Sequence, residues 1–222
     1  NPAMPLMDAI ITRRTSRRYA DAAVDRKTFE WIVHQAMHAP TACNEQQWKI
    51  ILIESPSIIR DLYARGSASF LQDTKQCFLL CYNRQTDNLH WLDHVQSGAA
   101  FITLFQLVAH TIGIGSCWIG HLPNKSELGR VFKIHRAYEP VALVSFGYYR
   151  NKTRMMERKH DTADLIMLDR FDSSKLHLES QRRTFFRTIG RYIYYKIPAV
   201  FRRPLKPFTQ RFEKKFYYES YD

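Results

Sequence analysis

The stretch RRTSRRYA, residues 13–20, gathers four arginines, two hydroxyl side chains and a tyrosine within eight positions. Guanidinium groups at this density repel one another unless an anion lies among them. A phosphate suits them well, because the planar guanidinium fork donates paired and permanently charged hydrogen bonds. Taken alone, the stretch is more typical of a basic helix end that faces water. A phosphate site therefore needs support from elsewhere in the chain.

Two histidines, His90 and His94, stand four residues apart in a segment with helical spacing, an arrangement that can bind a metal ion. No third ligand accompanies them, and they form no HEXXH motif. We therefore predict two polar positions on the surface of a helix, and no metal site.

The cysteines are widely spread and form no CxxC pair; they are Cys43, Cys77, Cys81 and Cys117. Neither a disulfide framework nor a zinc site is indicated, so a reducing cytoplasm is the expected compartment. We expect Cys77 and Cys81 in a buried strand. Cys117 has no arrangement of activating bases around it, so we expect a packed thiol and not a nucleophile. The first residues lack the apolar core of a signal peptide, and no apolar run is long enough for a membrane-spanning helix.

Periodicity predicts the elements that must position these groups. A short helix capped by Asp8 is expected to precede the arginines. The helix expected over residues 25–40 has apolar residues at helical spacing, namely Phe29, Ile32, Val33, Ala36 and Met37. Shorter helices are expected over 58–66 and 126–134. Three segments favour strands, namely 48–55, 76–83 and 140–149. The longest helical pattern, 91–116, is apolar most of the way round, which is typical of a central or interface helix.

Charge and composition divide the chain. The 222 residues carry a net charge of +12, and the 45% hydrophobic content excludes wholesale disorder. Residues 170–222 hold 13 Lys/Arg against 5 Asp/Glu, whereas the first 169 residues have a net charge of only +4. We predict a main domain over residues 1–169 and a basic, aromatic-rich extension over residues 170–222.

The extension allows several interpretations. Twelve of the protein's 30 aromatic residues lie between positions 185 and 221, interleaved with arginine and lysine. Such a segment can lie on an anionic membrane surface, or it can wrap a partner subunit or bind an acidic protein. Membrane docking and subunit wrapping rank equally on the sequence. Nucleic acid, which is bound by the same residue types, ranks well behind.

The order of motifs along residues 7–168 resembles the FMN-dependent nitroreductase family. RRTSRRY resembles the family's Arg-Arg-Ser-x-Arg-x-Phe, and APTACNEQQW resembles its Ala-Pro-Ser-x-x-Asn-x-Gln-Pro-Trp. SGAAFITLFQLVAHTIGIGSCWIG is similar to its central helix running into Gly-Leu-Gly-x-x-Trp-Ile-Gly. VSFGYY resembles the strand that ends in Gly-Tyr, and RKHDTADLI is a looser match to the basic closing motif.

The resemblance implies an α+β fold, a three-layer sandwich whose central, mostly antiparallel sheet is flanked by helices, in an intertwined homodimer with FMN at the subunit interface. It also implies a ping-pong reaction in which NADH or NADPH reduces the flavin, leaves, and is replaced by a nitro, quinone or other conjugated acceptor. Two alternatives stay open. One is a dedicated biosynthetic flavin dehydrogenase or reductase. The other is a non-catalytic flavin-binding protein whose basic tail docks a membrane or a partner.

The resemblance assigns expected cofactor-binding residues to three segments and one outlying position. The phosphate and neighbouring polar groups would be held by Arg13, Arg14, Thr15 and Arg17, with Arg158 and Lys159 as candidates for the second half of the phosphate clamp. A loop from the other subunit would contribute Pro40, Thr41, Asn44 and Gln46. The segment beside the flavin ring would contribute Cys117, Trp118, Ile119 and Gly120.

Three further expectations follow from the same resemblance, and a fourth, the location, follows from the cysteines and the tail. Arg18 falls at a variable position, so we expect it to be solvated. Gln47 stands where the family usually has proline, which puts the rigidity of that loop in question. No catalytic side chain is predicted, because the flavin itself carries the hydride. The expected location is cytoplasmic, with peripheral membrane contact possible through the tail.

Overall fold

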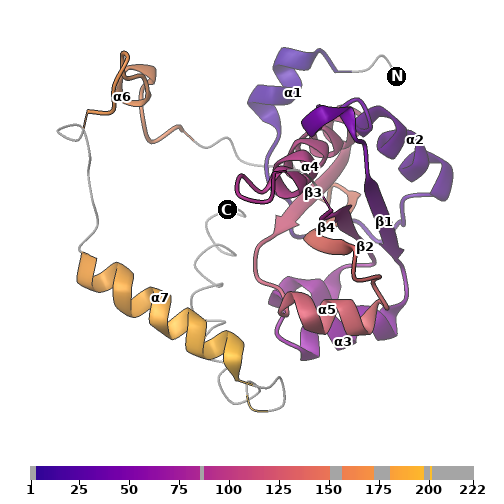
Figure 1. Ribbon diagram of the computed structural model, residues 1–222. Helices are drawn as coiled ribbons and strands as arrows, with labels where there is room; N and C mark the ends of the chain where they lie inside the picture. The colour runs from indigo at the N-terminus through magenta and orange to yellow at the C-terminus, as the bar shows by residue number, and fades with distance from the viewer. Residues whose placement is uncertain (1–3, 86–87, 151–156, 173–180, 198–200, 202–222) are drawn as a thin grey trace.

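A four-stranded antiparallel sheet forms the centre of the molecule in the computed structural model, which describes residues 4–85, 88–150, 157–172, 181–197 and 201 (Figure 1). The strand order is β1-β2-β4-β3. The strands are β1 (Trp48–Ile53), β2 (Gln76–Asn83), β3 (Ile114–Ile119) and β4 (Tyr138–Tyr148). Strand β2 is buried over almost its whole length, as its apolar sequence predicts.

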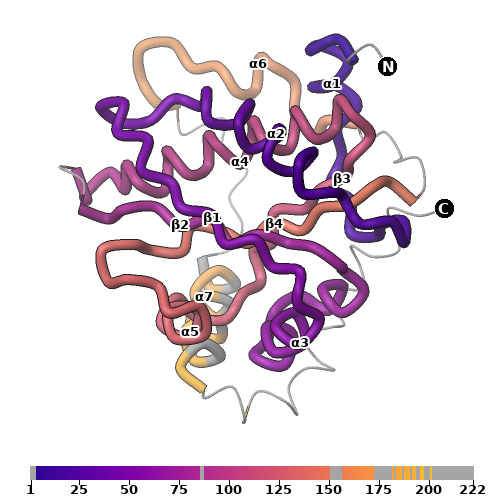
Figure 2. Tube along the Cα trace, turned by 90° about the vertical axis from the view of Figure 1, so that its right-hand side faces the viewer, coloured from indigo at the N-terminus to yellow at the C-terminus, as the bar shows by residue number. Residues whose placement is uncertain are grey.

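Helices cover both faces of the sheet (Figure 2). Residues on β2 alternate between the two cores, with Phe78 and Leu80 on one side and Leu79 on the other. The first core includes α2 (Arg26–Ala36) and α4 (Asp93–Thr111). The second includes α3 (Pro56–Ala64), the 3-10 helix η2 (Ser69–Asp73) and α5 (Lys125–Val131). The predicted three-layer α+β architecture is confirmed.

Helix α2 forms as its sequence pattern predicts. The side chain of Asp25 caps it by accepting a hydrogen bond from the Thr28 N–H at 3.0 Å. Its apolar side is buried, and Phe29 stacks on Phe146 of β4 at a centroid distance of 5.1 Å. Met37 was expected on this buried side, but it follows the last helical residue and is 47% exposed.

Strand β3 was not predicted. Its residues were expected to continue the long helical pattern to residue 116, but α4 ends at Thr111. Gly113 adopts a left-handed φ of 82°, which terminates the helix and reverses the chain. Residues 114–119 then pair with β4 along its free edge, from Ile114 opposite Tyr148 to Ile119 opposite Leu143.

Helix α1 (Leu6–Thr12) begins directly after Pro5, so the prediction that Asp8 caps it is wrong; Asp8 lies in its first turn. The 3-10 helix η1 (Ala42–Asn44) leads into β1. Helices α6 (Thr162–Leu165) and α7 (Gln181–Lys196) lie outside the three layers (Figure 1). Within the described ranges, no helix has the length and apolar content needed to cross a bilayer.

Candidate active site

The arginine-rich segment leaves α1 and runs along the start of β3. Thr15 forms a parallel bridge with Ser116, and the Ser16 N–H donates to the Ser116 carbonyl at 3.0 Å. Further along, Tyr19 bridges Tyr149 at the end of β4. The segment is therefore held against the sheet and is not a helix end projecting into water.

Two glycines make this close approach possible. A Cβ on Gly115 would lie 2.7 Å from Cε1 of Tyr149 and 2.8 Å from Cβ of Ser16. A Cβ on Gly147 would lie 2.8 Å from Cβ of Tyr19. Any larger residue at either position would push the segment away from the sheet.

Two cations, Arg13 and Arg14, stand at the start of the segment. Arg13 and Arg14 are half-buried. Burial lowers the pKa of Arg13, and the neighbouring cations Arg14 and Arg158 lower it further against the opposing effect of Tyr149. Arg158 is remote in the sequence and is exposed, and its effect on the pKa of Arg13 is the smallest of these. A half-buried group of like charges of this kind fits a polyvalent anion such as phosphate.

Arg17, further along the same segment, lies beside η2 and β3. Its guanidinium carbon lies 5.9 Å from the centroid of the Phe70 ring on η2. It also neighbours the buried Cys117 thiol, whose pKa is raised to about 11 by burial despite the opposing effect of Arg17. Cys117 is therefore a packed, protonated thiol, as predicted. The adjacent Arg18 is exposed, also as predicted.

A hydrogen-bonded chain that the sequence did not predict supports the cations. His110, near the end of α4, has its Nδ1 2.8 Å from the Tyr149 hydroxyl and its Nε2 2.8 Å from the Thr12 hydroxyl. Burial, Arg13 and Arg14 together lower the pKa of His110, so the ring is held neutral. Burial also raises the pKa of Tyr149 to about 12. In the sequence, the one sign of this hydrogen-bonded chain was a histidine near the end of a mostly apolar helix.

The end of β3 carries the residues expected beside the flavin ring. Cys117 and Ile119 are buried, whereas Trp118 is 41% exposed and Gly120 is exposed. The carbonyl of the following residue, His121, accepts a hydrogen bond from the Ala68 N–H at 3.1 Å. This contact fixes the segment that carries Phe70 beside the strand.

The loop over residues 40–46 lies elsewhere in the same chain. The Ala42 N–H donates to the hydroxyl of Ser97, in the first half of α4, at 3.2 Å. His110, which contacts the arginine segment, is 13 positions further along that helix. At 1.5 Å per residue the two anchor points are about 20 Å apart. One chain therefore does not bring the loop residues Pro40, Thr41, Asn44 and Gln46 together with the arginines.

The same loop has an unusual backbone. Cys43, Asn44 and Gln46 have left-handed φ values of 50°, 55° and 52°. The conformation is held from within, because the Gln46 side-chain amide donates to Asn44 Oδ1 at 2.8 Å and the Gln46 N–H donates to Thr41 Oγ1 at 3.2 Å. Left-handed conformations at several non-glycine residues are typical of ligand-binding loops.

Gln47, which replaces the family's proline, holds its end of the loop by hydrogen bonds. Its carbonyl accepts from the Asn83 N–H at 3.4 Å, and its side-chain oxygen accepts from the Asn83 amide. These contacts to β2 provide the rigidity that a proline ring would supply by fixing φ.

The prediction for the two histidines was wrong. Helix α4 begins at Asp93, so His90 precedes it. His94 is only 2% exposed, with its Nε2 3.7 Å from Glu139 Oε1. Within the described part of the chain, no three metal-binding side chains cluster.

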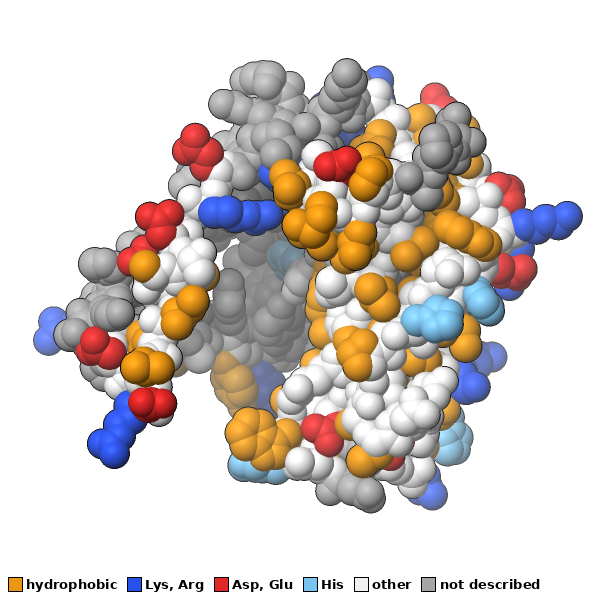
Figure 3. Space-filling model, turned by 90° about the horizontal axis from the view of Figure 1, so that it is seen from above, with side chains coloured by type: hydrophobic (Ala, Val, Ile, Leu, Met, Phe, Trp, Pro, Cys, Tyr) orange, Lys and Arg blue, Asp and Glu red, His pale blue; other side chains and the backbone are white. Residues whose placement is uncertain are grey.

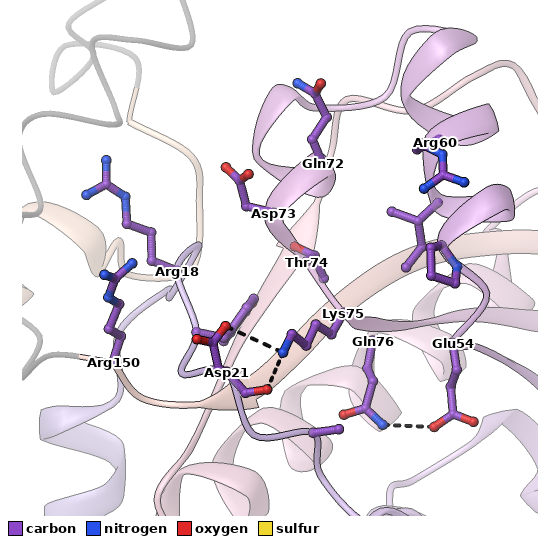
Figure 4. Close-up of a pocket in the computed structure, with 14 residues that line it drawn as sticks. Arg18, Asp21, Glu54, Arg60, Gln72, Asp73, Thr74, Lys75, Gln76 and Arg150 are labelled. Atoms are coloured by element: carbon purple, nitrogen blue, oxygen red, sulfur yellow. Dashed lines mark hydrogen bonds and ion pairs between the residues drawn. The ribbon is translucent and has the colours of Figure 1, made fainter.

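A separate hollow of about 1070 Å³ lies beside the ends of β1 and β2 (Figure 4). Its lining includes both cations and anions, and several of these are already paired. Lys75 Nζ lies 3.4 Å from Asp21 Oδ1, and the Gln76 amide donates to Glu54 Oε1 at 2.8 Å. None of the predicted cofactor-binding residues lines this hollow. The site is therefore defined by the arginine segment and not by the hollow.

Comparisons with known proteins point to one family. The model of the Nitroreductase family matches residues 10–101 and 64–148. An Archaeoglobus fulgidus protein, provisionally named NADH dehydrogenase/NAD(P)H nitroreductase, is 27% identical over 174 residues, covering 77% of this chain and 95% of that protein.

Solved structures agree on the fold. A provisionally named NADH oxidase from Clostridium acetobutylicum is 26% identical with a TM-score of 0.64, and the match covers 74% of this chain and 100% of that one. An FMN-dependent nitroreductase from Clostridium difficile is 19% identical with a TM-score of 0.58, covering 78% and 99%.

Proposed function

Because the chain belongs to the Nitroreductase family, we propose that it is an FMN-dependent oxidoreductase. It transfers a hydride from NADH or NADPH, through the flavin, to a nitro, quinone or other conjugated acceptor. Names of the relatives support an oxidoreductase in general, and one structural neighbour is described as FMN-dependent. The observation that carries the proposal is the half-buried pair Arg13 and Arg14 at the start of a segment that is held against β3.

These residues fit the phosphate of FMN. Arg13 and Arg14 are neighbouring cations and both are half-buried, so an anion with two negative charges would relieve their repulsion. The chain of Thr12, His110 and Tyr149 would hold the segment in place from behind. Because His110 is neutral, it adds no further positive charge.

The ring would lie beside the end of β3. Trp118 and Gly120 are exposed there and can offer an apolar surface and backbone donors. Bound FMN supplies the hydride-transfer chemistry, so the chain itself needs no nucleophile. The protonation of Cys117 at neutral pH agrees with this assignment.

A second copy would complete the site. Asn44 and Gln46 are exposed polar groups on a loop whose anchor lies about 20 Å from that of the arginines. In a homodimer with twofold symmetry, each loop can reach the arginine segment of its partner. Helix α1 offers apolar surface for such contact, since Leu6 and Met7 are 65% and 63% exposed. Apolar side chains gather on the face seen in Figure 3.

If the nicotinamide and the acceptor use the same surface beside Trp118, the nicotinamide would leave before the acceptor binds, which would give ping-pong kinetics. The nicotinamide and a planar conjugated acceptor share the need for a flat, apolar surface against the flavin. This shared need favours aromatic nitro compounds and quinones as the acceptor class.

Two neighbouring arginines provide the test. Arg17→Ala removes a cation that faces Phe70 and Cys117, whereas Arg18→Ala removes an equal charge from an exposed position. Loss of a charged hydrogen bond costs about 1.5–3 kcal/mol, which corresponds to a roughly 10- to 150-fold weaker FMN affinity. We expect this loss for Arg17→Ala alone, measured by flavin fluorescence titration. Equal affinity in both variants would return the stretch to the basic-surface interpretation.

Reduction must be measured separately from binding. The FMN-loaded protein is mixed anaerobically with NADH or NADPH, and the flavin absorbance is followed. Bleaching followed by reoxidation with a quinone supports the oxidoreductase. Stable flavin binding without bleaching by either nucleotide would instead identify a flavin carrier.

A further inference from the structure

Helix α7 lies apart from the sheet and its covering helices (Figure 1). The rest of the described chain leaves its large apolar side chains exposed. Phe185 and Phe186 are 61% and 70% exposed, and Tyr192 and Ile193 are 64% and 53% exposed. A helix of this length gains its stability from packing its apolar side against something. We therefore expect the apolar side of α7 to pack against a partner.

Beyond its first turn, where Arg182 falls on the same side as the apolar residues, α7 has two chemically different sides. Apolar residues recur at positions 185, 189 and 193, every fourth residue, with residue 186 beside them. Arginines recur at positions 183, 187 and 191, also every fourth residue, and this row falls on the opposite side of the helix. The helix is therefore amphipathic, with an apolar side and a basic side.

The charge of α7 selects the kind of partner. Residues 181–196 contain five Lys/Arg and no Asp/Glu. Lys196 lies near the apolar side, with its Nζ 5.3 Å from the Tyr192 ring centroid, as in side chains that keep a charged tip at an apolar boundary. Surface-lying membrane helices combine aromatic residues with a basic side, and a helix that carries only positive charge is attracted to anionic headgroups.

We propose that α7 is a membrane-surface helix that lies on an anionic lipid bilayer. Its apolar side chains enter the boundary between headgroups and acyl chains, and its basic side stays among the lipid phosphates and water. Several solved relatives have the fold without such an extension: the match covers 98–100% of those chains but only 74–78% of this one. Docking is thus separable from the flavin site.

Vesicle flotation with the full-length protein tests the proposal. The probes are phosphatidylcholine vesicles with and without anionic phosphatidylglycerol. The test variant replaces three exposed apolar residues of α7, Phe185→Ser/Phe186→Ser/Ile193→Ser. The matched control replaces three exposed apolar residues outside the helix, Leu165→Ser/Leu168→Ser/Phe171→Ser. A third variant, Arg183→Gln/Arg187→Gln/Arg191→Gln, removes charge only.

The native chain and the control are expected to float with anionic vesicles. The variant that loses the three apolar residues of α7 is expected to remain in the bottom fraction. Each arginine near the surface contributes roughly fivefold, so the arginine variant should bind on the order of 100-fold more weakly. Binding should also weaken in high salt. FMN content should be the same in all four proteins, which keeps this test independent of the flavin assignment.

Two results would overturn the proposal. One is flotation that is absent in the native chain or equal in all variants. The other is a smaller oligomer for the apolar variant in sedimentation without lipid, together with unchanged vesicle binding. That second result would show that α7 wraps a second copy of the chain.

Discussion

Replacing Gly115 with alanine tests how the arginine segment is held against the sheet. The new methyl group would lie 2.7 Å from Cε1 of Tyr149 and 2.8 Å from Cβ of Ser16, whereas carbon atoms in contact are usually about 3.5 Å apart or more. Neither neighbour can move away easily, because Tyr149 is hydrogen-bonded to His110 and Ser16 is hydrogen-bonded to Ser116. The segment must therefore move by roughly 0.7 Å.

Overpacking of this kind costs about 1–3 kcal/mol. For a chain of this length, the melting temperature should fall by roughly 2–10 °C. The shift also moves Arg13 and Arg17 away from their positions, so we expect FMN affinity to fall by about tenfold or more, since 1.4 kcal/mol corresponds to a factor of ten. Calorimetry of the apoprotein and fluorescence titration with FMN measure the two effects.

Gly129→Ala is the matched control. A Cβ at this position in α5 meets no atom within 4 Å, and alanine favours a helix over glycine by about 0.8–1 kcal/mol. The control should melt at the same temperature or slightly higher, with unchanged FMN affinity. If Gly115→Ala behaves like Gly129→Ala in both measurements, the arginine segment does not depend on its contact with β3.

Three further predictions concern the shared site, the cysteines and the pH dependence. Mixing unfolded Arg17→Ala and Asn44→Ala chains and refolding them should restore FMN to about a quarter of the sites, since half of the dimers then carry one intact site; no recovery means that one chain supplies both halves. Alkylation with iodoacetamide at pH 8 should modify Cys43 only, because it is exposed, while burial raises the pKa of Cys77 and Cys81 to about 12 and of Cys117 to about 11; mass spectrometry showing fast modification of Cys117 would contradict its burial. The pKa of His110 is lower in the folded chain than in the unfolded chain, so as the pH falls through about 6.5 the unfolded chain takes up a proton on His110 before the folded chain does. The free energy of unfolding should therefore decrease from about pH 6.5 downwards until the pH passes the folded pKa. Urea unfolding between about pH 7.5 and 5 should show a smaller decrease for His110→Gln, and an identical decrease would exclude His110 as its source.

Local patterns in the sequence were sufficient to predict several helices and strands. Strand β2 occupies residues 76–83, the range that its apolar and aromatic content predicts, and β1 and α2 follow their patterns closely. The order of motifs was also sufficient for the family. These features are encoded by neighbouring residues, because periodicity and capping act over only a few positions.

Strand β3 and His94 show where local patterns fail. The residues of β3 are apolar like those of the preceding helix, so only pairing with β4, more than 20 residues later, makes them a strand. His94 falls on the buried side of α4 because Phe101, Phe105 and their neighbours dock that helix on the sheet. Both outcomes depend on contacts between distant segments.

The sequence by itself determined which residue types are present for a flavin phosphate site: a dense arginine segment, a polar loop and a glycine-rich turn. Tertiary structure alone decided which of them meet. It placed His110 and Tyr149 beside Arg13, and it anchored the loop around Asn44 and the arginine segment at points of α4 that are about 20 Å apart. The physical reason is that charge repulsion, burial and hydrogen bonding depend on distance in space, and only the packed sheet and helices set those distances.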